Sequence, residues 1–428
     1  PHFDRPEDYF ETSVQFFREY QCLYNFPNTE ILVHSILDKI DINDDTIDLN
    51  AVLANHNGFL RSFFEKFKIL RVENDYIEEP IECDVNVPLS PKKKHEIIHL
   101  AKEIKDICED IDCNVVVDFG SGLGYLDQLI FETANYKVLG IECHDSHYVG
   151  AKKRQRKYHH DSIHNVKYIK HRVTENSFEN IQTYLEDKFP NYGQFCITGL
   201  HACADLTIDA IDLFLKMTDA KALVIMPCCY HKMAGKDGYF ENFPLSACLK
   251  GIFEKYNGYE YMKVPFMRLG AQPPCLESKI EDLVFNLLSR AVLQLYAYRY
   301  NCKLKRNKRK AVKTKIMQNN FDAYLQDANT NGFSLIKNLP TDPQNKVETS
   351  DFNLEEIRTL WNEISSLTFK KAGVFILLQN YLQPIIENFV LYDRIVYMKE
   401  KGVTDCRIKK ILNERTSPRC LALLAKKK

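Results

Sequence analysis

A glycine-rich segment between a short apolar run and an amphipathic stretch most restricts how this chain can fold. Val115–Phe119 is typical of a buried β-strand, and Gly120, Gly122 and Gly124 follow at alternate positions before a helix-like pattern begins at Tyr125. Glycines spaced in this way let the backbone turn tightly and approach a ligand closely, because no Cβ stands in the way. The pattern predicts a strand–turn–helix unit that binds a ligand at the turn.

Strands and helices alternate around this unit. Further strand-like runs lie at 136–142, 166–169, 195–200 and 222–226, with helical patterns such as 146–159 and 177–188 between them. This alternation predicts an α/β fold, Rossmann-like, with a doubly wound and mostly parallel sheet flanked by helical N-terminal and C-terminal regions. Such a sheet binds ligands outside the carboxyl ends of its strands.

Three regions are expected along the chain. Residues 1–85 are predicted to be an acidic helical region, with one helix running from Asn28 to Leu37. Residues 86–235 form the predicted sheet-containing core. Residues 236–428 are predicted to be mostly helical, with a basic loop at 303–315 and an apolar run at 420–425 that could return to the sheet as a strand.

Charge is unevenly distributed. The chain has 57 Lys and Arg against 58 Asp and Glu, a formal charge of -1. Residues 1–85 hold 18 acidic and 7 basic residues, a net charge of -11, which leaves +10 for the rest. A uniformly basic nucleic-acid-binding protein is therefore excluded, but a locally basic enzyme is not.

Other classes of protein are also excluded. There is no run of 18 uninterrupted apolar residues, so no transmembrane helix and no membrane contact are predicted. Pro1–Arg5 lacks the pattern of a signal peptide, so we expect a cytoplasmic and/or nuclear protein that is not secreted. The 14 cysteines are then expected to be reduced thiols.

An acidic residue at the end of the second predicted strand indicates a ligand with ribose hydroxyls. Glu142 lies 18 residues after Gly124, where a nucleotide-binding fold places such an acid. A dinucleotide fingerprint needs Gly or Ala at its sixth position, and Tyr125 stands there instead. The segment Asp118–Leu126 resembles motif I of class I S-adenosylmethionine (SAM)-dependent methyltransferases.

That resemblance implies SAM as the cofactor. Lys94 and His95 lie in the helix before the first strand, which often borders the methionine end of the cofactor in class I enzymes. The complete set of predicted cofactor-binding residues is Lys94, His95, Asp118, Gly120, Ser121, Gly122, Gly124, Tyr125, Leu126, Glu142, Leu200 and His201. The residue that contacts the adenine stays open, with Glu175 or Asn176 as candidates.

The fourth and fifth predicted strands end in residues capable of chemistry. His201 follows the fourth strand and is a candidate base, because some acceptors must lose a proton as they are methylated. Cys228, Cys229 and Tyr230 follow the fifth strand and are the other catalytic candidates. Buried cysteines without an activating neighbour usually only pack, which is the simpler interpretation of this pair.

Two further interpretations of these cysteines are considered. RNA cytosine-C5 methyltransferases place cysteines after the same two strands, but the residues around Cys203 and Cys228 do not match theirs. A zinc site could be formed by His201, Cys203, Cys228, Cys229 and His231. Their spacing is not that of a known zinc finger, so packed thiols are favoured and no metal is predicted.

Over residues 88–425 the chain resembles the eukaryotic methyltransferase-like protein 25 family, which includes the ribosomal RNA adenine dimethylase domain-containing protein. The resemblance implies a class I methyltransferase fold and SAM dependence. Adenine N6 enzymes carry Asn/Asp-Pro-Pro-Tyr/Phe after the fourth strand, whereas this chain has Leu200–Cys203 there, which argues against adenine dimethylation. The His-x-Cys and Cys-Cys elements look more like those of a tRNA acceptor-stem 2′-O-methyltransferase. The segments that carry the family resemblance are Ser90–Glu96, Asp118–Gly124, Gly199–Cys203, Cys228–His231, Leu391–Arg394 and Ser417–Arg419.

The predicted function is SAM-dependent methyl transfer to RNA, at a ribose 2′-O or at a base. Lys152–Lys157 and Lys303–Lys315 supply charge for phosphate contacts, although such basic faces are often only solvated. One alternative is a protein methyltransferase acting on a basic partner, which the acidic N-terminal region would recruit. The other is a SAM-binding scaffold without catalysis.

Overall fold

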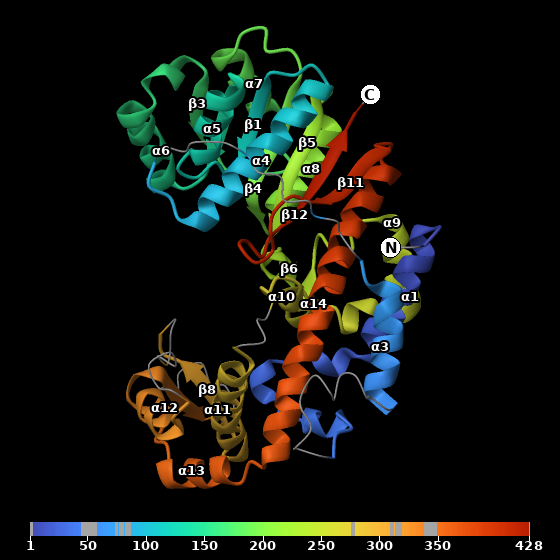
Figure 1. Cartoon of the computed structure of the whole chain (residues 1–428), viewed down its shortest axis with the longest axis vertical. Coiled ribbons are helices and arrows are strands. Elements are labelled where there is room, and N and C mark those ends of the chain that lie inside the picture. Colours follow the sequence, from blue (N-terminus) through green and yellow to red (C-terminus); the bar gives the residue numbers. More distant parts are fainter. Residues whose placement is uncertain are drawn as a thin grey trace, which may run out of the picture. The chain divides into compact units, whose positions relative to one another are not determined.

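The chain folds into two compact units. The computed structural model describes residues 3–43, 58–72, 76, 81, 87–274, 279–308, 312, 319–337 and 349–427. The first unit holds Pro1–Gln15, Arg71–Pro274 and Gln383–Lys428, and the second holds Phe16–Leu70 and Cys275–Leu382. Figure 1 labels the elements of both units. Each unit is assembled from separated parts of the chain, whereas the sequence analysis divides the chain into three consecutive regions.

A seven-stranded sheet is the centre of the first unit (Figure 1). Its strand order is β11-β12-β5-β4-β1-β2-β3, and the five strands from β1 to β5 are parallel. The doubly wound, Rossmann-like class I methyltransferase fold predicted from the sequence is therefore confirmed. The parallel strands are β1 (Val115–Phe119), β2 (Lys137–Glu142), β3 (Val166–Lys170), β4 (Phe195–Cys203) and β5 (Ala220–Cys228).

Two further strands extend the sheet beyond β5, and each is antiparallel to the strand before it in the sheet. β12 (Leu421–Lys426) pairs with β5 and covers the apolar run noted at 420–425. β11 (Asp405–Lys410) pairs with β12 and was not expected from the sequence. Its residues are mostly charged and largely exposed, so no apolar run marks this strand.

Helices connect the parallel strands in turn, as parallel pairing requires. The helix before β1 begins at Ser90, whose side chain accepts a hydrogen bond from Lys93 N at 3.3 Å, and Pro91 occupies the first helical position. The helices around the sheet are α4 (Pro91–Asp110), α5 (Tyr125–Ala134), α6 (Asp145–Tyr158), α7 (Phe178–Lys188) and α8 (Leu206–Lys216).

Four further helices contribute to the first unit, namely α1 (Pro6–Glu19), α9 (Ala247–Tyr256), α10 (Val264–Gly270) and the end of α14 (Ser366–Glu400). Phe10 of α1 packs edge-on against Phe389 of α14, with 5.5 Å between ring centroids. Within the described part of the chain, α14 is the one helix long and apolar enough to cross a membrane, but 78% of its apolar window is buried in the protein. That burial is typical of a core helix.

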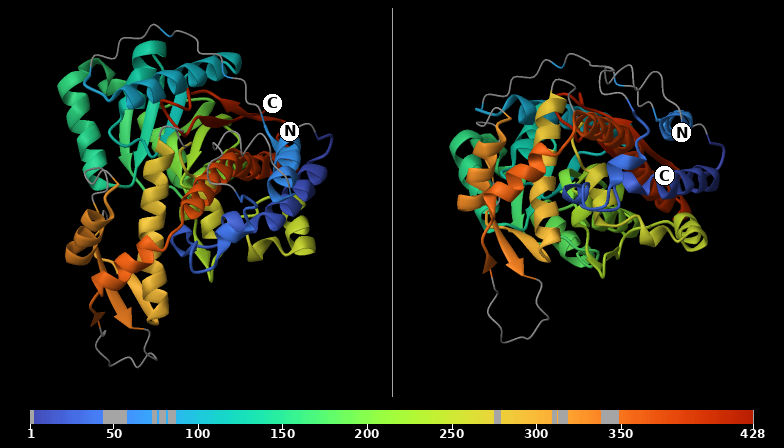
Figure 2. Two further views of the ribbon diagram at one scale, coloured as in Figure 1. Left: turned by 60° about the horizontal axis from the view of Figure 1, so that its bottom comes forward. Right: turned by 90° about the horizontal axis from the view of Figure 1, so that it is seen from below.

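The second unit is mostly helical and contains a small antiparallel sheet of order β10-β9-β8. Figure 2 shows its elements between residues 279 and 365 in yellow and orange, and those between residues 16 and 70 in blue. Trp361 stacks on Phe321 at 4.1 Å in its core. Its main elements are α3 (Gly58–Leu70), α11 (Ile280–Arg299), β8 (Cys302–Arg306), α12 (Phe321–Asp327), β9 (Phe333–Lys337), β10 (Thr349–Ser350) and α13 (Leu354–Asn362).

Two local predictions in this unit are wrong. The segment from Asn28 to Leu37 is not one helix, because it forms two short 3₁₀ turns, Asn28–Glu30 and Ile36–Lys39, separated by Ser35 in the left-handed region at φ 49°. The start of the predicted basic loop is strand β8, which pairs with β9. Residues 309–311 and 313–315 of that predicted loop lie outside the described residues.

Short elements complete the fold. Besides Asn28–Glu30 and Ile36–Lys39, the described residues form the 3₁₀ turns η1 (Gln21–Leu23), η4 (His160–His164), η5 (Tyr230–Lys232) and η6 (Gly258–Glu260). η9 (Ala328–Gly332) is a single π-helical turn. A two-stranded ribbon is formed by β6 (Gly235–Lys236) and β7 (Tyr239–Phe240).

Candidate active site

The loop after β1 uses its three glycines in different ways. Gly120, Gly122 and Gly124 have φ values of 78°, 61° and 74°, which a residue with a Cβ adopts at a cost of about 1–2 kcal/mol. A Cβ on Gly124 would collide with the phenol of Tyr168 from β3, so Gly124 is needed for packing. A Cβ on Gly122 would meet nothing closer than 4.0 Å, which leaves this side of the backbone open to a ligand.

Glu142 holds the loop from the end of β2. Its Oε2 accepts a hydrogen bond from Gly122 N at 2.9 Å, and its Oε1 accepts one from His144 N at 2.7 Å. The residue is 5% exposed. A carboxylate has about four lone-pair sites, so Glu142 retains capacity for ribose hydroxyls beside the open face of Gly122.

Buried polar atoms gather behind this loop. Among the described residues, no hydrogen-bond partner is found for Asp118 Oδ1, Ser121 Oγ or either carboxylate oxygen of Asp127. Leaving such a group unsatisfied costs about 1–3 kcal/mol, so a polar ligand or solvent is expected to complete this region. The glycine loop after β1, the carboxylate of Glu142 and these unsatisfied polar atoms together fit SAM, which presents ribose hydroxyls and the charged groups of methionine.

Asp118 and Asp127 form a buried acidic pair. Burial raises the pKa of Asp118 to about 6, while the positive charge of Lys93 opposes the shift. Burial and the charge of Asp118 raise the pKa of Asp127 well above its usual value. Burial of both carboxyl groups therefore makes the pair retain a proton to higher pH than two solvated carboxyl groups would.

Helix α4 presents different residues from those predicted. Burial lowers the pKa of Lys93, and the nearby charges of Glu96, Asp118 and Asp127 oppose that shift, so Lys93 faces the carboxyl groups of the site. Lys94 is half-buried. His95 Nε2 accepts a hydrogen bond from Asn413 N at 3.1 Å and so holds a C-terminal loop. Lys93 therefore lies nearer the carboxyl groups of the site than the predicted residues do, and the cofactor-binding role of Lys94 and His95 stays a prediction.

His201 lies at a break in the pairing of β4 with β5. The register shifts between Gly199 and Ala202, and His201 has a φ of 59°. Irregularities of this kind re-aim a side chain and are frequent next to active sites. Here the break directs the imidazole towards α4, where His201 Nε2 lies 3.1 Å from Glu96 Oε2.

Glu96, the contact of His201, is not among the site residues predicted from the sequence. It is 2% exposed, and its other oxygen accepts a hydrogen bond from Ser417 Oγ at 2.8 Å. Burial alone would raise its pKa, but the hydrogen bonds from His201 and Ser417 and the nearby positive charges lower the pKa to about 2. An ionised carboxylate only accepts hydrogen bonds, so His201 donates to Glu96 from Nε2.

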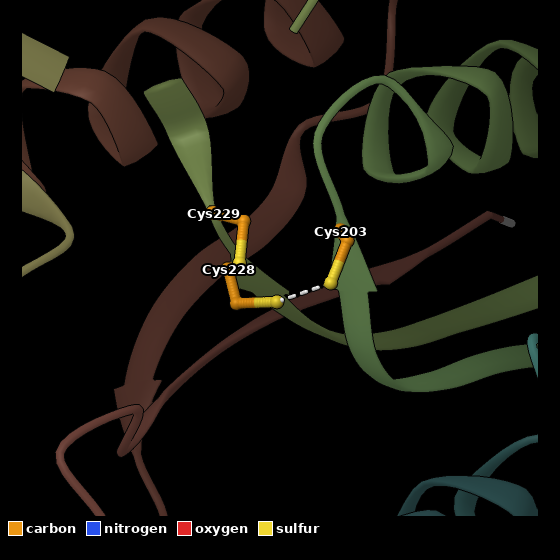
Figure 3. Close-up of side chains that lie close together, drawn as sticks. All are labelled: Cys203, Cys228 and Cys229. Carbon is orange, nitrogen blue, oxygen red and sulfur yellow. Dashed lines mark hydrogen bonds between the residues drawn. The ribbon is translucent and has the colours of Figure 1, made fainter. Parts of the chain in front are cut away.

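Three cysteine sulfurs meet at the ends of β4 and β5 (Figure 3). Cys203 Sγ lies 2.9 Å from Cys228 Sγ, and the sulfurs of Cys203, Cys228 and Cys229 all lie within 4.8 Å of one another. A hydrogen bond from Cys228 lowers the pKa of the Cys203 thiol to about 6. The same contact raises the pKa of Cys228. Cys203 is thus the residue of this group that carries a thiolate most readily.

Tyr230 does not join these groups. It is 1% exposed, and its hydroxyl donates a hydrogen bond to Glu387 Oε1 at 3.0 Å. Glu387 also accepts a hydrogen bond from Arg419 Nη1 at 2.6 Å. Tyr230 therefore points into the core, away from the three cysteine sulfurs, and its predicted catalytic role stays a prediction that its location does not favour.

The remaining predicted cofactor residues lie around the start of α5 and the end of β4. Tyr125 packs its ring against the guanidinium of Arg154, at 3.8 Å from the ring centroid. Leu126 is buried in α5, and Leu200 is half-buried in β4. Leu206 was not predicted, but its side chain lies 3.4 Å from the position of a Cβ on Gly120 and so borders the loop.

Comparison with known proteins identifies a domain over the same part of the chain. Residues 92–236 match a family model described as a methyltransferase domain. Over 265 residues the chain is 26% identical to "Probable methyltransferase-like protein 25" of Mus musculus, covering 59% of this chain and 40% of that protein. The chain thus spans about two fifths of this curated relative. Residues 92–236 are thus similar to a methyltransferase domain.

Among solved structures, the chain is similar to the N-terminal domain of human METTL16 in complex with SAH, with 16% identity and a TM-score of 0.26, covering 42% of this chain and 66% of that chain. It is also similar to the methyltransferase domain of bacterial CtHen1, with 13% identity and a TM-score of 0.25, covering 39% of this chain and 85% of that chain.

Proposed function

We propose that this chain, a class I methyltransferase similar to methyltransferase-like protein 25, methylates RNA at a ribose hydroxyl with SAM as the methyl donor. The observation that carries the proposal is the contact of His201 with Glu96 at the carboxyl end of β4. This pair supplies an oriented base next to the cofactor loop, which an acceptor that must lose a proton requires.

The cofactor would be held by the backbone of Gly120 and Gly122, with Glu142 on its ribose hydroxyls and Asp118 near its methionine part. Bound SAM supplies an electrophilic methyl group on a sulfonium. Gly122 keeps the loop surface free of side-chain atoms, and Glu142 keeps the loop in place through the Gly122 N–H.

Proton transfer is assigned to His201. A hydroxyl that donates its hydrogen bond to Nδ1 becomes a better nucleophile as its proton moves to the imidazole. Glu96 fixes the tautomer and stabilises the imidazolium that forms, because it stays ionised with a pKa of about 2. Ser417 holds the second oxygen of Glu96 and so fixes the orientation of the carboxylate.

RNA is favoured as acceptor by the basic end of α6. Lys153, Arg156 and Lys157 are exposed there, and Tyr158 is 53% exposed. Exposed cations and an exposed ring suit phosphate contacts and base stacking. Arg154 of the same helix contacts Tyr125, the residue directly after Gly124, so the basic surface adjoins the cofactor loop.

Transfer of radiolabel from SAM into small RNA tests the proposal. We expect label that nuclease removes and protease does not, and mass spectrometry of the digested RNA should identify a 2′-O-methyl nucleoside. The variant His201→Ala should bind SAM normally in calorimetry but lose at least about 100-fold in rate. Label that only protease removes would show that the acceptor is a protein and would contradict the proposal. SAM binding without any methyl transfer would indicate that the chain is a SAM-binding scaffold without catalysis.

A further inference from the structure

Two neighbouring strands bring three thiols to one point at the carboxyl edge of the sheet. Cys203 of β4 is paired in register with Cys228 of β5, so their Cβ atoms lie on the same face. Cys229 would normally point to the opposite face, but its φ of 53° turns the chain at this residue. Figure 3 shows the side chains of Cys203 and Cys228 directed towards each other, with Cys229 beside them.

We propose that Cys203, Cys228 and Cys229 form a binding site for one soft divalent metal ion of the zinc class, with a fourth coordination position open to solvent. The proposal is independent of the acceptor and of methyl transfer. A Zn²⁺ ion with Zn–S bonds of about 2.3 Å holds its sulfur ligands about 3.8 Å apart. The three sulfurs, at 2.9 Å for one pair and within 4.8 Å overall, reach this spacing by small side-chain rotations.

Simple packing does not account for this arrangement. Cysteines that act as core residues are buried, as Cys108 and Cys196 are in this fold. Cys203 is exposed and Cys229 half-buried, so two of the three sulfurs lie on the solvent side of Cys228. A disulfide bond is about 2.05 Å long, so the Cys203 and Cys228 sulfurs at 2.9 Å are not covalently joined.

The surroundings also suit a trithiolate site. The positive charge of Lys232 acts on Cys203 and would offset part of the excess negative charge of three thiolates around a divalent ion. A rival group of Glu142, Cys143 and His144 is less suitable, because both oxygens of Glu142 already accept backbone hydrogen bonds. An open fourth position is typical of zinc sites that bind an exogenous ligand, and closed sites are typical of structural zinc.

Metal content and cobalt spectroscopy test the proposal on the full chain. We expect about one zinc ion per chain after purification under reducing conditions. Replacement by Co²⁺ should give thiolate-to-metal charge-transfer absorption together with tetrahedral d–d bands. The variants Cys203→Ser and Cys229→Ser should weaken Co²⁺ binding by more than the roughly 10–100-fold that loss of an outer-shell partner costs.

Matched variants distinguish metal binding by these three thiols from binding elsewhere on the chain. Cys248→Ser removes a half-buried thiol outside the group, and Cys143→Ser removes the rival ligand, so both should retain wild-type Co²⁺ binding. Because Cys228 is buried and its variant could fail to fold, the decisive change is at exposed Cys203. The proposal is overturned by a reduced wild-type chain that binds neither ion, by unchanged binding in Cys203→Ser, or by thiol counting that finds two cysteines in a disulfide.

Discussion

His201 at the end of β4 and Glu96 of α4 lie 3.1 Å apart although 105 residues separate them in the chain. Neither is informative alone, since a half-buried histidine and a helical glutamate are common. Together they form an oriented acid–base pair beside the glycine loop, and Ser417 from a third part of the chain completes it. The contact gives His201 one tautomer and one orientation, which a proton acceptor in catalysis requires.

Glu96→Gln should slow methyl transfer by roughly 10–100-fold while leaving the dissociation constant for SAM unchanged. The amide keeps the shape of the carboxylate but cannot stabilise an imidazolium. Rates with saturating SAM and calorimetric binding would measure the two effects. Glu109→Gln on the same helix, in an exposed ion pair, is the matched control and should behave as wild type. Equal rates for the two variants would show that Glu96 does not act through His201.

Gly122→Arg should abolish SAM binding without unfolding the first unit, because the new side chain would fill the open side of the loop. Gly193→Arg is the control: Gly193 has a φ of 69° and nothing within 4 Å, so it carries the same backbone strain away from the site. Calorimetry and urea unfolding would be run on both variants. SAM binding by Gly122→Arg at wild-type affinity would refute the location of the cofactor.

Gly124→Ala should destabilise the fold by about 2 kcal/mol or more, because the added methyl group meets the ring of Tyr168 and the residue has a positive φ. Gly193→Ala shares the positive φ but has an open surrounding, so it isolates the strain of the backbone. The difference between their free energies of unfolding in urea measures the Tyr168 contact. Equal values would mean that the ring moves aside at no cost.

Asp127→Asn should make the protein more stable near neutral pH and reduce the pH dependence of its stability. The pKa values of Asp118 and Asp127 are raised in the folded state, to about 6 for Asp118, so the folded protein binds more protons than the unfolded one above pH 4. Stability is therefore lost as pH rises through that window towards the folded pKa. Urea unfolding from pH 5 to pH 8 would measure the slope. The exposed Asp161→Asn should leave the slope unchanged, and an unchanged slope in Asp127→Asn would contradict the assignment.

Replacing Lys153, Arg156 and Lys157 together by Ala should weaken RNA binding and reduce its salt dependence. Each lost phosphate contact lowers the slope of log affinity against log salt by about 0.7 for a single strand. Fluorescence anisotropy over a salt series measures it. Replacing Lys250 and Lys255 of α9 by Ala is the control for a general loss of positive charge. The same slope in all three proteins would exclude the α6 surface as the RNA contact.

The sequence predicted the central fold well because its signals there are local. β1 lies at Val115–Phe119 as expected, since five consecutive apolar or buried residues before glycines leave little freedom. Glu142 could be predicted because the run of apolar residues in β2 also shows where that strand ends. β11 could not, because four of its six residues are charged and only Cys406 and Ile408 mark its inner face.

The partners around the site depended on tertiary structure. Lys92–Lys94, His95 and Glu96 are adjacent in sequence, and only the rotation of α4 against the sheet determines that Lys93 and Glu96 face the site. Tyr230 follows two cysteines of the site but points into the core towards Glu387. Sequence adjacency could not distinguish these directions, since one residue further along a helix or strand changes the face.

The bond between Ser417 and Glu96 spans 321 residues and has a consequence for synthesis of the protein. A ribosome makes β1 to β5 long before it makes residue 417, so the nascent chain holds the glycine loop and Glu96 without Ser417 or the strands that close the sheet. An unfinished chain therefore holds Glu96 without the hydrogen bond that fixes its carboxylate, and this part of the site is completed only once residue 417 has been made.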